Sequence, residues 1–97
     1  MLAFEVRVNG RNFLIERERT FEKYGFFTNI YLKAQNVTEA EYIAMHILRN
    51  NDQLRLSVRN EKNDPPTMYA DQITEIFNYD EIEHKEQGLI WYRENED

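Results

Sequence analysis

The stretch from residue 25 to residue 50 constrains the fold most, because a strand pattern runs directly into a helix pattern there. Residues 25–34 alternate between two sets of side chains, and this period of two is typical of a half-buried strand. Gly25 allows a bend at the start of the strand. We expect the more apolar set to face the core: Phe26, Thr28, Ile30, Leu32 and Ala34.

The helix pattern that follows begins at Thr38, a residue type that caps helix N-termini well. Glu41 stands three residues later, which is the spacing of a capping box. Asn50 and Asn51 are expected to end the helix, since asparagine tolerates the left-handed C-terminal conformation. The apolar residues recur at spacings of three and four and predict one buried stripe: Ala40, Ile43, Ala44, Ile47 and Leu48.

The chain before this unit reads as a β-hairpin followed by a charged connection. Residues 2–8 alternate as a strand, and Asn9-Gly10 is a strong signal for a two-residue hairpin turn. Residues 11–16 would then be the return strand. Residues 16–24 are charged and lack a strand period, so we expect an exposed loop or a frayed continuation of the hairpin there. Such a loop would be either a solvated connection or a binding loop.

The chain after the helix predicts further strands. Residues 53–59 alternate, with Leu54, Leu56 and Val58 expected to face inward. The segment that follows contains two prolines, which predict a loop. Residues 68–79 are ambiguous between a short helix and a bulged strand, and their aromatic and β-branched residues favour the strand.

At the end of the chain we expect an acidic turn at 80–87, a last strand at 89–92 and a disordered segment at 94–97. The predicted fold class is therefore α+β, in the order β-β-β-α-β-β-β. An antiparallel sheet of five to six strands would carry one helix on one face, in a single domain over residues 1–97. One helix leaves part of such a sheet bare, which favours a homodimer.

Composition excludes several classes of protein. The absence of cysteine rules out disulfides and thiol chemistry and fits a cytoplasmic location. No apolar run is long enough to span a bilayer, and the N-terminus lacks the form of a signal peptide. Net charge is −6, with +2 over residues 1–60 and −8 over residues 61–97. This acidic balance makes nucleic-acid binding unlikely, because such binding rests mostly on phosphate neutralisation.

The central pattern also resembles that of small bacterial and phage α+β proteins. The resemblance rests on Gly25-Phe26-Phe27-Thr28, on the extended segment to Ala34, and on Thr38-Glu39-Ala40-Glu41 with Leu48 and Leu54. It implies a compact sheet-plus-helix domain. It implies no activity and transfers no functional residue.

Catalytic chemistry has little support in the sequence. His46 lies off the apolar stripe of the helix, and His84 lies among carboxylates whose spacing matches no known metal loop. Ser57 is the only serine and has no partner for a triad nearby in the sequence. The three glycines are too far apart for a phosphate loop. We therefore expect no enzyme, no metal site and no cofactor.

Two candidate binding surfaces remain. The first is the outer face of the sheet, where basic and aromatic side chains would bind an anion or stack a base. Its expected residues are Arg7, Tyr31, Lys33, Arg55 and Arg59. The second is a negative surface that would attract a basic region of a partner protein. Its expected residues are Asp71, Glu75, Asp80, Glu81, Glu83 and Glu86.

The leading hypothesis is a small acidic interaction protein that binds and modulates or inhibits a macromolecular partner. Phage inhibitors of host defence and toxin-neutralising proteins are of this kind, which is an argument by analogy. The alternative is a module that holds a nucleotide or another anion on the outer face of the sheet. The two differ in whether the purified protein carries a ligand that absorbs like a base.

Overall fold

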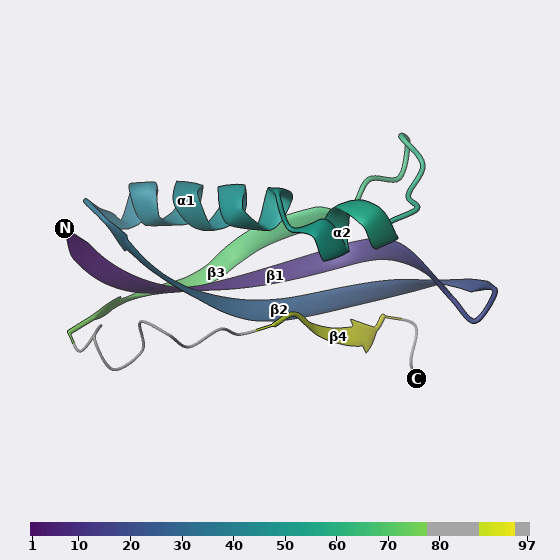
Figure 1. The fold of residues 1–97 in the computed structure, drawn as a ribbon, viewed down its shortest axis with the longest axis horizontal. Helices are drawn as coiled ribbons and strands as arrows, with labels where there is room; N and C mark the ends of the chain where they lie inside the picture. The colour runs from purple at the N-terminus through teal and green to yellow at the C-terminus, as the bar shows by residue number, and fades with distance from the viewer. Residues whose placement is uncertain (78–87, 95–97) are drawn as a thin grey trace.

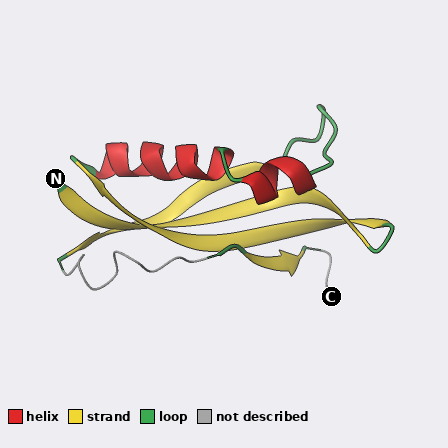
Figure 2. Ribbon diagram, in the orientation of Figure 1, coloured by secondary structure: helices red, strands yellow, loops and turns green. Residues whose placement is uncertain are grey.

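A computed structural model describes residues 1–77 and 88–94 of the chain. Its elements are β1 (Leu2–Arg17), β2 (Thr20–Ala34), α1 (Val37–Arg49), α2 (Asp52–Ser57), β3 (Thr67–Ile76) and β4 (Ile90–Arg93). The four strands form one antiparallel sheet in the order β3-β1-β2-β4. Both helices lie on the same face of this sheet (Figures 1 and 2). The α+β class is confirmed, whereas the expected five to six strands and the order β-β-β-α-β-β-β are wrong.

The first two predicted strands are one continuous strand. Asn9-Gly10 makes no turn, because no described glycine has the positive φ that a type I′ turn requires. The chain reverses instead at Glu18 and Arg19, whose φ angles are 52° and 71°. Residues 16–24 therefore continue the hairpin, with paired strand residues on both sides of a two-residue turn, and do not form a loop. The tip of this hairpin projects beyond α2 at one end of the molecule (Figure 1).

A β-bulge interrupts the pairing of β1 with β2 between Gly10 and Phe13. Asn12 lies in this bulge with a φ of 64°, a conformation that asparagine adopts more readily than most residues. Gly10 packs so closely on Phe26 that a Cβ would overlap its ring, and that Cβ would also lie 2.7 Å from the ring of Phe13. Glycine at this position therefore allows close approach within a strand.

Helix α1 begins two residues earlier than the sequence suggested. Its N-cap is Asn36, whose side-chain oxygen accepts from the backbone N–H of Glu39 at 2.8 Å. The carboxylate of Glu39 in turn accepts from the backbone N–H of Gln35 at 3.1 Å. Thr38 is therefore inside the helix, and its predicted box with Glu41 is wrong. The pairs Asn36/Glu39 and Thr38/Glu41 have the same spacing in the sequence. Asn36 caps the helix, and asparagine is at least as favourable at the N-cap as threonine.

The buried face of α1 is made by Ala40, Ala44 and Leu48, which recur every four residues. The small side chains of Ala40 and Ala44 allow the helix to lie close to the sheet, where it contacts the core residues of β1, β2 and β3. Ile43 is half-buried, as expected at the edge of the stripe. Ile47 is 47% exposed, so its assignment to the core is wrong.

The segment predicted as a strand at 53–59 is largely helix α2. Asn51 caps it by accepting from the backbone N–H of Leu54 at 3.2 Å. Asn50 ends α1 with a φ of −100°, so the expected left-handed end is also wrong. Alternation over so few residues does not separate a strand from a helical turn, and leucine, arginine and glutamine are good helix formers. Leu54 was predicted to face inward from a strand, and it is buried as a residue of α2.

The strands after α2 largely follow the sequence pattern. β3 pairs with β1 and carries the expected irregularity, opposite Arg7 and Val8. β4 pairs with β2 and places Trp91 beside Phe26. The expected acidic turn at 80–87 and the last three residues of the chain lie outside the described residues. Neither described helix is long and apolar enough to cross a membrane.

The burial pattern of α1 leads to a matched pair of substitutions. Leu48→Ala removes a side chain that is 2% exposed, so we expect the free energy of unfolding to fall by about 2–5 kcal/mol. Ile47→Ala removes a half-exposed side chain from the same turn and should cost less than about 1 kcal/mol. Urea denaturation measures both, and equal losses would contradict the orientation of α1 described above.

Candidate functional site

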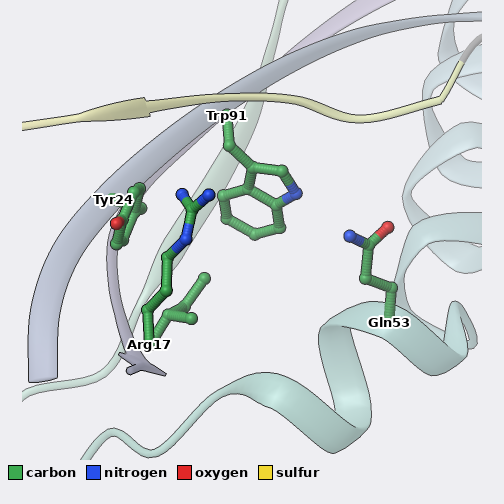
Figure 3. Close-up of a pocket in the computed structure, with 5 residues that line it drawn as sticks. Arg17, Tyr24, Gln53 and Trp91 are labelled. Carbon is green, nitrogen blue, oxygen red and sulfur yellow. The ribbon is translucent and has the colours of Figure 1, made fainter. Parts of the chain in front are cut away.

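The described structure contains a pocket between the β1–β2 hairpin, helix α2 and β4. It encloses about 290 Å³. Its lining residues are Ile15, Arg17, Tyr24, Gln53 and Trp91. Figure 3 shows Arg17, Tyr24 and Trp91 grouped on one side of the pocket, with Gln53 of α2 on the opposite side. The pocket therefore combines aromatic walls with one cation.

The bulge in β1 determines which side chains reach this pocket. Before the bulge, Val6 and Val8 are the buried side chains on the helix-covered face. The register shift changes the parity, so Phe13 and Ile15 continue this face after the bulge. Arg17 follows at the same period and thereby lines the pocket. An unbroken strand would send Arg17 to the other face of the sheet.

The aromatic walls are held by a cluster of rings. Trp91 lies with its ring centroid 5.2 Å from that of Phe26, 5.9 Å from Phe13 and 6.4 Å from Tyr24. All three contacts are edge-on, an arrangement that aromatic rings favour. Phe13, Phe26 and Tyr24 are buried. The walls are therefore packed before any ligand arrives.

Glu22 and Arg93 form an ion pair near the pocket, whereas Arg17 does not belong to one among the described residues. Glu22 forms an ion pair with Arg93 at 3.1 Å and accepts from the hydroxyl of Tyr24 at 3.2 Å. Arg17 has no ion pair with any carboxylate of residues 1–77 and 88–94. Its guanidinium is thus the uncompensated cation of this pocket.

The outer face of the sheet offers a less open site than the sequence suggested. Arg7 pairs with Asp71 at 3.2 Å, so its charge is compensated within the chain. Tyr31 lies opposite Glu5, and partial burial first, then this carboxylate, raise the pKa of its hydroxyl. Lys33 is on the same strand, opposite Ala3. The three residues therefore share one face, but Arg7 and Tyr31 already have acidic neighbours there.

The other two residues of that predicted set do not join this face. Arg55 is part of α2, which covers the opposite side of the sheet (Figure 1). Arg59 follows α2, and its backbone N–H donates to the carbonyl of Leu14 at 2.8 Å. The reason is the helix at 52–57, which removes the strand period on which their placement depended.

The predicted negative surface is only partly described. Asp71 is engaged by Arg7, whereas Glu75 lies opposite Phe4. Side chains at paired positions share a face, so Glu75 belongs with the helix-covered side and Asp71 with the outer side. The remaining members lie outside the described residues: Asp80, Glu81, Glu83 and Glu86.

A polar cluster fixes the loop after α2 to the bulge. The Asn60 side chain accepts from the Leu14 N–H and donates to the carbonyls of Asn12 and Asp64, each at 2.8 Å. Asp64 pairs with Lys23 and accepts from the Asn12 side chain at 2.7 Å. The hydrogen bond from Lys23 first, then that from Asn12, lower the pKa of the Asp64 carboxyl. This cluster holds together the end of the sheet that carries the pocket.

Two of the three residues considered for catalysis are described by the structure. His46 stacks on the exposed ring of Tyr42, with centroids 6.4 Å apart. Ser57 is the last residue of α2, and His84 lies outside the described residues. No group of three or more histidines, aspartates and glutamates suited to a metal occurs in the described part of the chain.

Sequence reasoning missed every residue of the pocket as a site. Nothing in the sequence distinguishes Trp91 and Tyr24 from the other aromatic residues as site residues. Arg17 is part of a charged stretch that lacks the period of two of a strand. A β-bulge leaves no reliable mark in one sequence, although a glycine within a strand pattern hints at one. Comparison with protein-family models, with curated proteins and with solved structures gives no match to this chain. The resemblance to small bacterial and phage proteins stays a prediction.

The polar cluster predicts a pH effect on stability. Because the folded state lowers the pKa of Asp64, its contribution is complete above the unfolded pKa of about 4 and is lost as pH falls through the lower folded value. Asp64→Asn should therefore lower stability at neutral pH and flatten its decline between about pH 4 and pH 2. Glu61→Gln removes one charge from the same loop and serves as the control. Urea midpoints across this pH range measure the effect, and parallel curves for Asp64→Asn and the wild type would contradict it.

Proposed function

We propose that this protein is a non-enzymatic binding module that engages a protein partner through the end of the β1–β2 hairpin and modulates or inhibits that partner. The observation that carries the proposal is Arg17, which has no ion pair among residues 1–77 and 88–94 and lines a pocket with the packed rings of Tyr24 and Trp91. Lys23 and Arg93 at this end of the molecule are ion-paired, whereas Arg17 is exposed and lines a pocket with the aromatic rings. Aromatic residues and arginine are the types that most often dominate the energy of protein interfaces.

The hairpin tip adds a second exposed feature at the same end of the molecule. Phe21 is 56% exposed and lies opposite Glu16, on the face away from the pocket. Glu18 and Arg19 both adopt positive φ, although neither is a glycine or an asparagine. Such a turn costs roughly 1–2 kcal/mol per residue relative to glycine. Charged residues kept at a strained, projecting turn are more readily explained by binding than by stability.

The two surfaces expected from the sequence have weaker support. Arg55 and Arg59 do not lie on the outer face of the sheet, and Arg7 is paired with Asp71. Anion binding on that face is therefore the second candidate function. The negative surface is represented in the described residues only by Asp71 and Glu75, which lie on different faces. Self-association, expected from the bare sheet face, stays a prediction: Phe27 and Ile90 lie opposite each other, 39% and 53% exposed.

Partner capture from the native host tests the proposal. We expect the tagged wild type to enrich a protein that Phe21→Ser and Arg17→Glu no longer enrich in quantitative mass spectrometry. Tyr42→Ser, which alters an exposed aromatic residue on α1, is the control and should capture the partner normally. A partner lost only after changing Asp80, Glu81 and Glu83 to lysine would instead support the negative surface. A partner retained by all hairpin variants would overturn the proposal.

The strained tip gives a prediction in which stability and binding move in opposite directions. Glu18→Asn with Arg19→Gly supplies the residues that a type I′ turn prefers, so the free energy of unfolding should rise by about 1–2 kcal/mol. Partner capture should fall, because two charged contacts are lost. Glu18→Gln with Arg19→Gln removes the same charges without easing the backbone, so it should reduce capture without stabilising the fold. Urea denaturation and the capture assay separate the two effects, and a more stable variant with unchanged capture would contradict the tip's role.

A further inference from the structure

We propose that the pocket at the hairpin end receives the carboxylate of an aspartate or glutamate in the partner protein, with an adjacent apolar side chain against the aromatic walls. The proposal rests on the proposed function and names the chemistry of the bound segment. Its residues are Arg17, Tyr24, Gln53 and Trp91, which line one cavity from three strands and a helix.

The cation selects an anion with a defined geometry. A guanidinium group presents parallel N–H donors that match the two oxygens of a carboxylate. Arg17 is exposed and makes no ion pair within the described residues, so no internal carboxylate there has to be displaced. The rings of Tyr24 and Trp91 line the same pocket as the Arg17 side chain (Figure 3). The planar guanidinium group is rigid, so an arginine loses less side-chain freedom per hydrogen bond formed than a lysine does.

Charge favours a carboxylate over a phosphate. A phosphate group carries up to two negative charges and is usually bound by several donors. Here the neighbouring cation, Arg93, is already paired with Glu22, and the whole chain carries a net charge of −6. One uncompensated guanidinium in an acidic protein balances one carboxylate.

Size favours a side chain over a nucleotide. The cavity of about 290 Å³ is at the lower limit of ordinary ligand pockets, which hold roughly 300–1,000 Å³. Ile15 and the two rings make most of its lining apolar, and Gln53 adds an amide that can both donate and accept. This combination suits a short peptide segment, whose backbone needs hydrogen bonds and whose apolar side chain needs a surface.

The test uses a dipeptide and its uncharged analogue. The probes are N-acetyl-Phe-Asp-amide and N-acetyl-Phe-Asn-amide, which have almost the same volume. Binding is followed on the folded wild type by the emission of Trp91, the only tryptophan, and by the NMR shifts of its indole N–H and of the Arg17 side-chain N–H. We expect saturation by the acidic dipeptide with a dissociation constant of about 1 mM or tighter. The analogue should bind at least about tenfold more weakly.

Two variants assign the preference to the pocket. Arg17→Gln should remove the difference between the two dipeptides, whereas Arg49→Gln, which changes an exposed arginine of α1 outside the pocket, should keep it. Equal binding of both dipeptides to the wild type, or no saturable shift up to about 10 mM, would overturn the proposal. Stronger binding of adenosine monophosphate or inorganic phosphate at the same residues would also overturn it and favour a phosphate ligand.

The outcome is separable from that of the proposed function. A partner captured through Phe21 and Arg17, together with dipeptides that bind equally, would keep the interaction surface and reject the carboxylate. Selective dipeptide binding, with no partner lost in the hairpin variants, would keep the pocket chemistry and reject the proposed function.

Discussion

The close approach of Gly10 to Phe26 and the bulge that follows it are the constraint on which the rest of the structure depends. The bulge changes the parity of β1, so each half of the strand sends its apolar side chains to the helix-covered face. The half before the bulge packs under α1. The half after it packs near Trp91 of β4 and lines the pocket together with Gln53 in the first turn of α2. Asn12, held at positive φ in the bulge, also binds the loop after α2. One irregularity therefore joins the hairpin, the loop and the pocket.

Ion pairs lie on the outer face of the sheet and also at the hairpin end, where Arg17 forms none with the described carboxylates. Arg7 with Asp71 forms one pair, and Lys23 with Asp64 another. Exposed pairs of this kind stabilise a fold by at most about 1 kcal/mol each, but they neutralise surfaces that would otherwise attract ions. Arg17 stands outside these pairs and is next to aromatic walls. Its position is therefore a better guide to binding than the total charge of the chain.

Sequence reasoning succeeded where a pattern is long and failed where two local signals competed. The strand at 25–34 and helix α1 follow extended periodicity, which tertiary contacts reinforce, whereas β3 and β4 were predicted mainly from their aromatic and β-branched residues. Asn9-Gly10 carries a strong turn signal, yet the apolar residues on both sides bury more surface when β1 runs straight through it. At 53–59 the alternation was too short to exclude a helix. These two errors account for the excess of predicted strands and for the misplaced Arg55 and Arg59.

The same competition explains why the pocket was invisible from the sequence. Its residues come from four separate elements, and Arg17 reaches it only because the bulge shifts the register. A chain optimised for stability alone would place Asn-Gly at the reversal of the hairpin, as this chain has at Asn9-Gly10. Instead, Glu18 and Arg19 form the reversal, and Gly10 allows the close approach of the Phe26 ring. The local preference for glycine or asparagine is therefore broken at this projecting turn, next to an arginine that has no ion pair among the described residues.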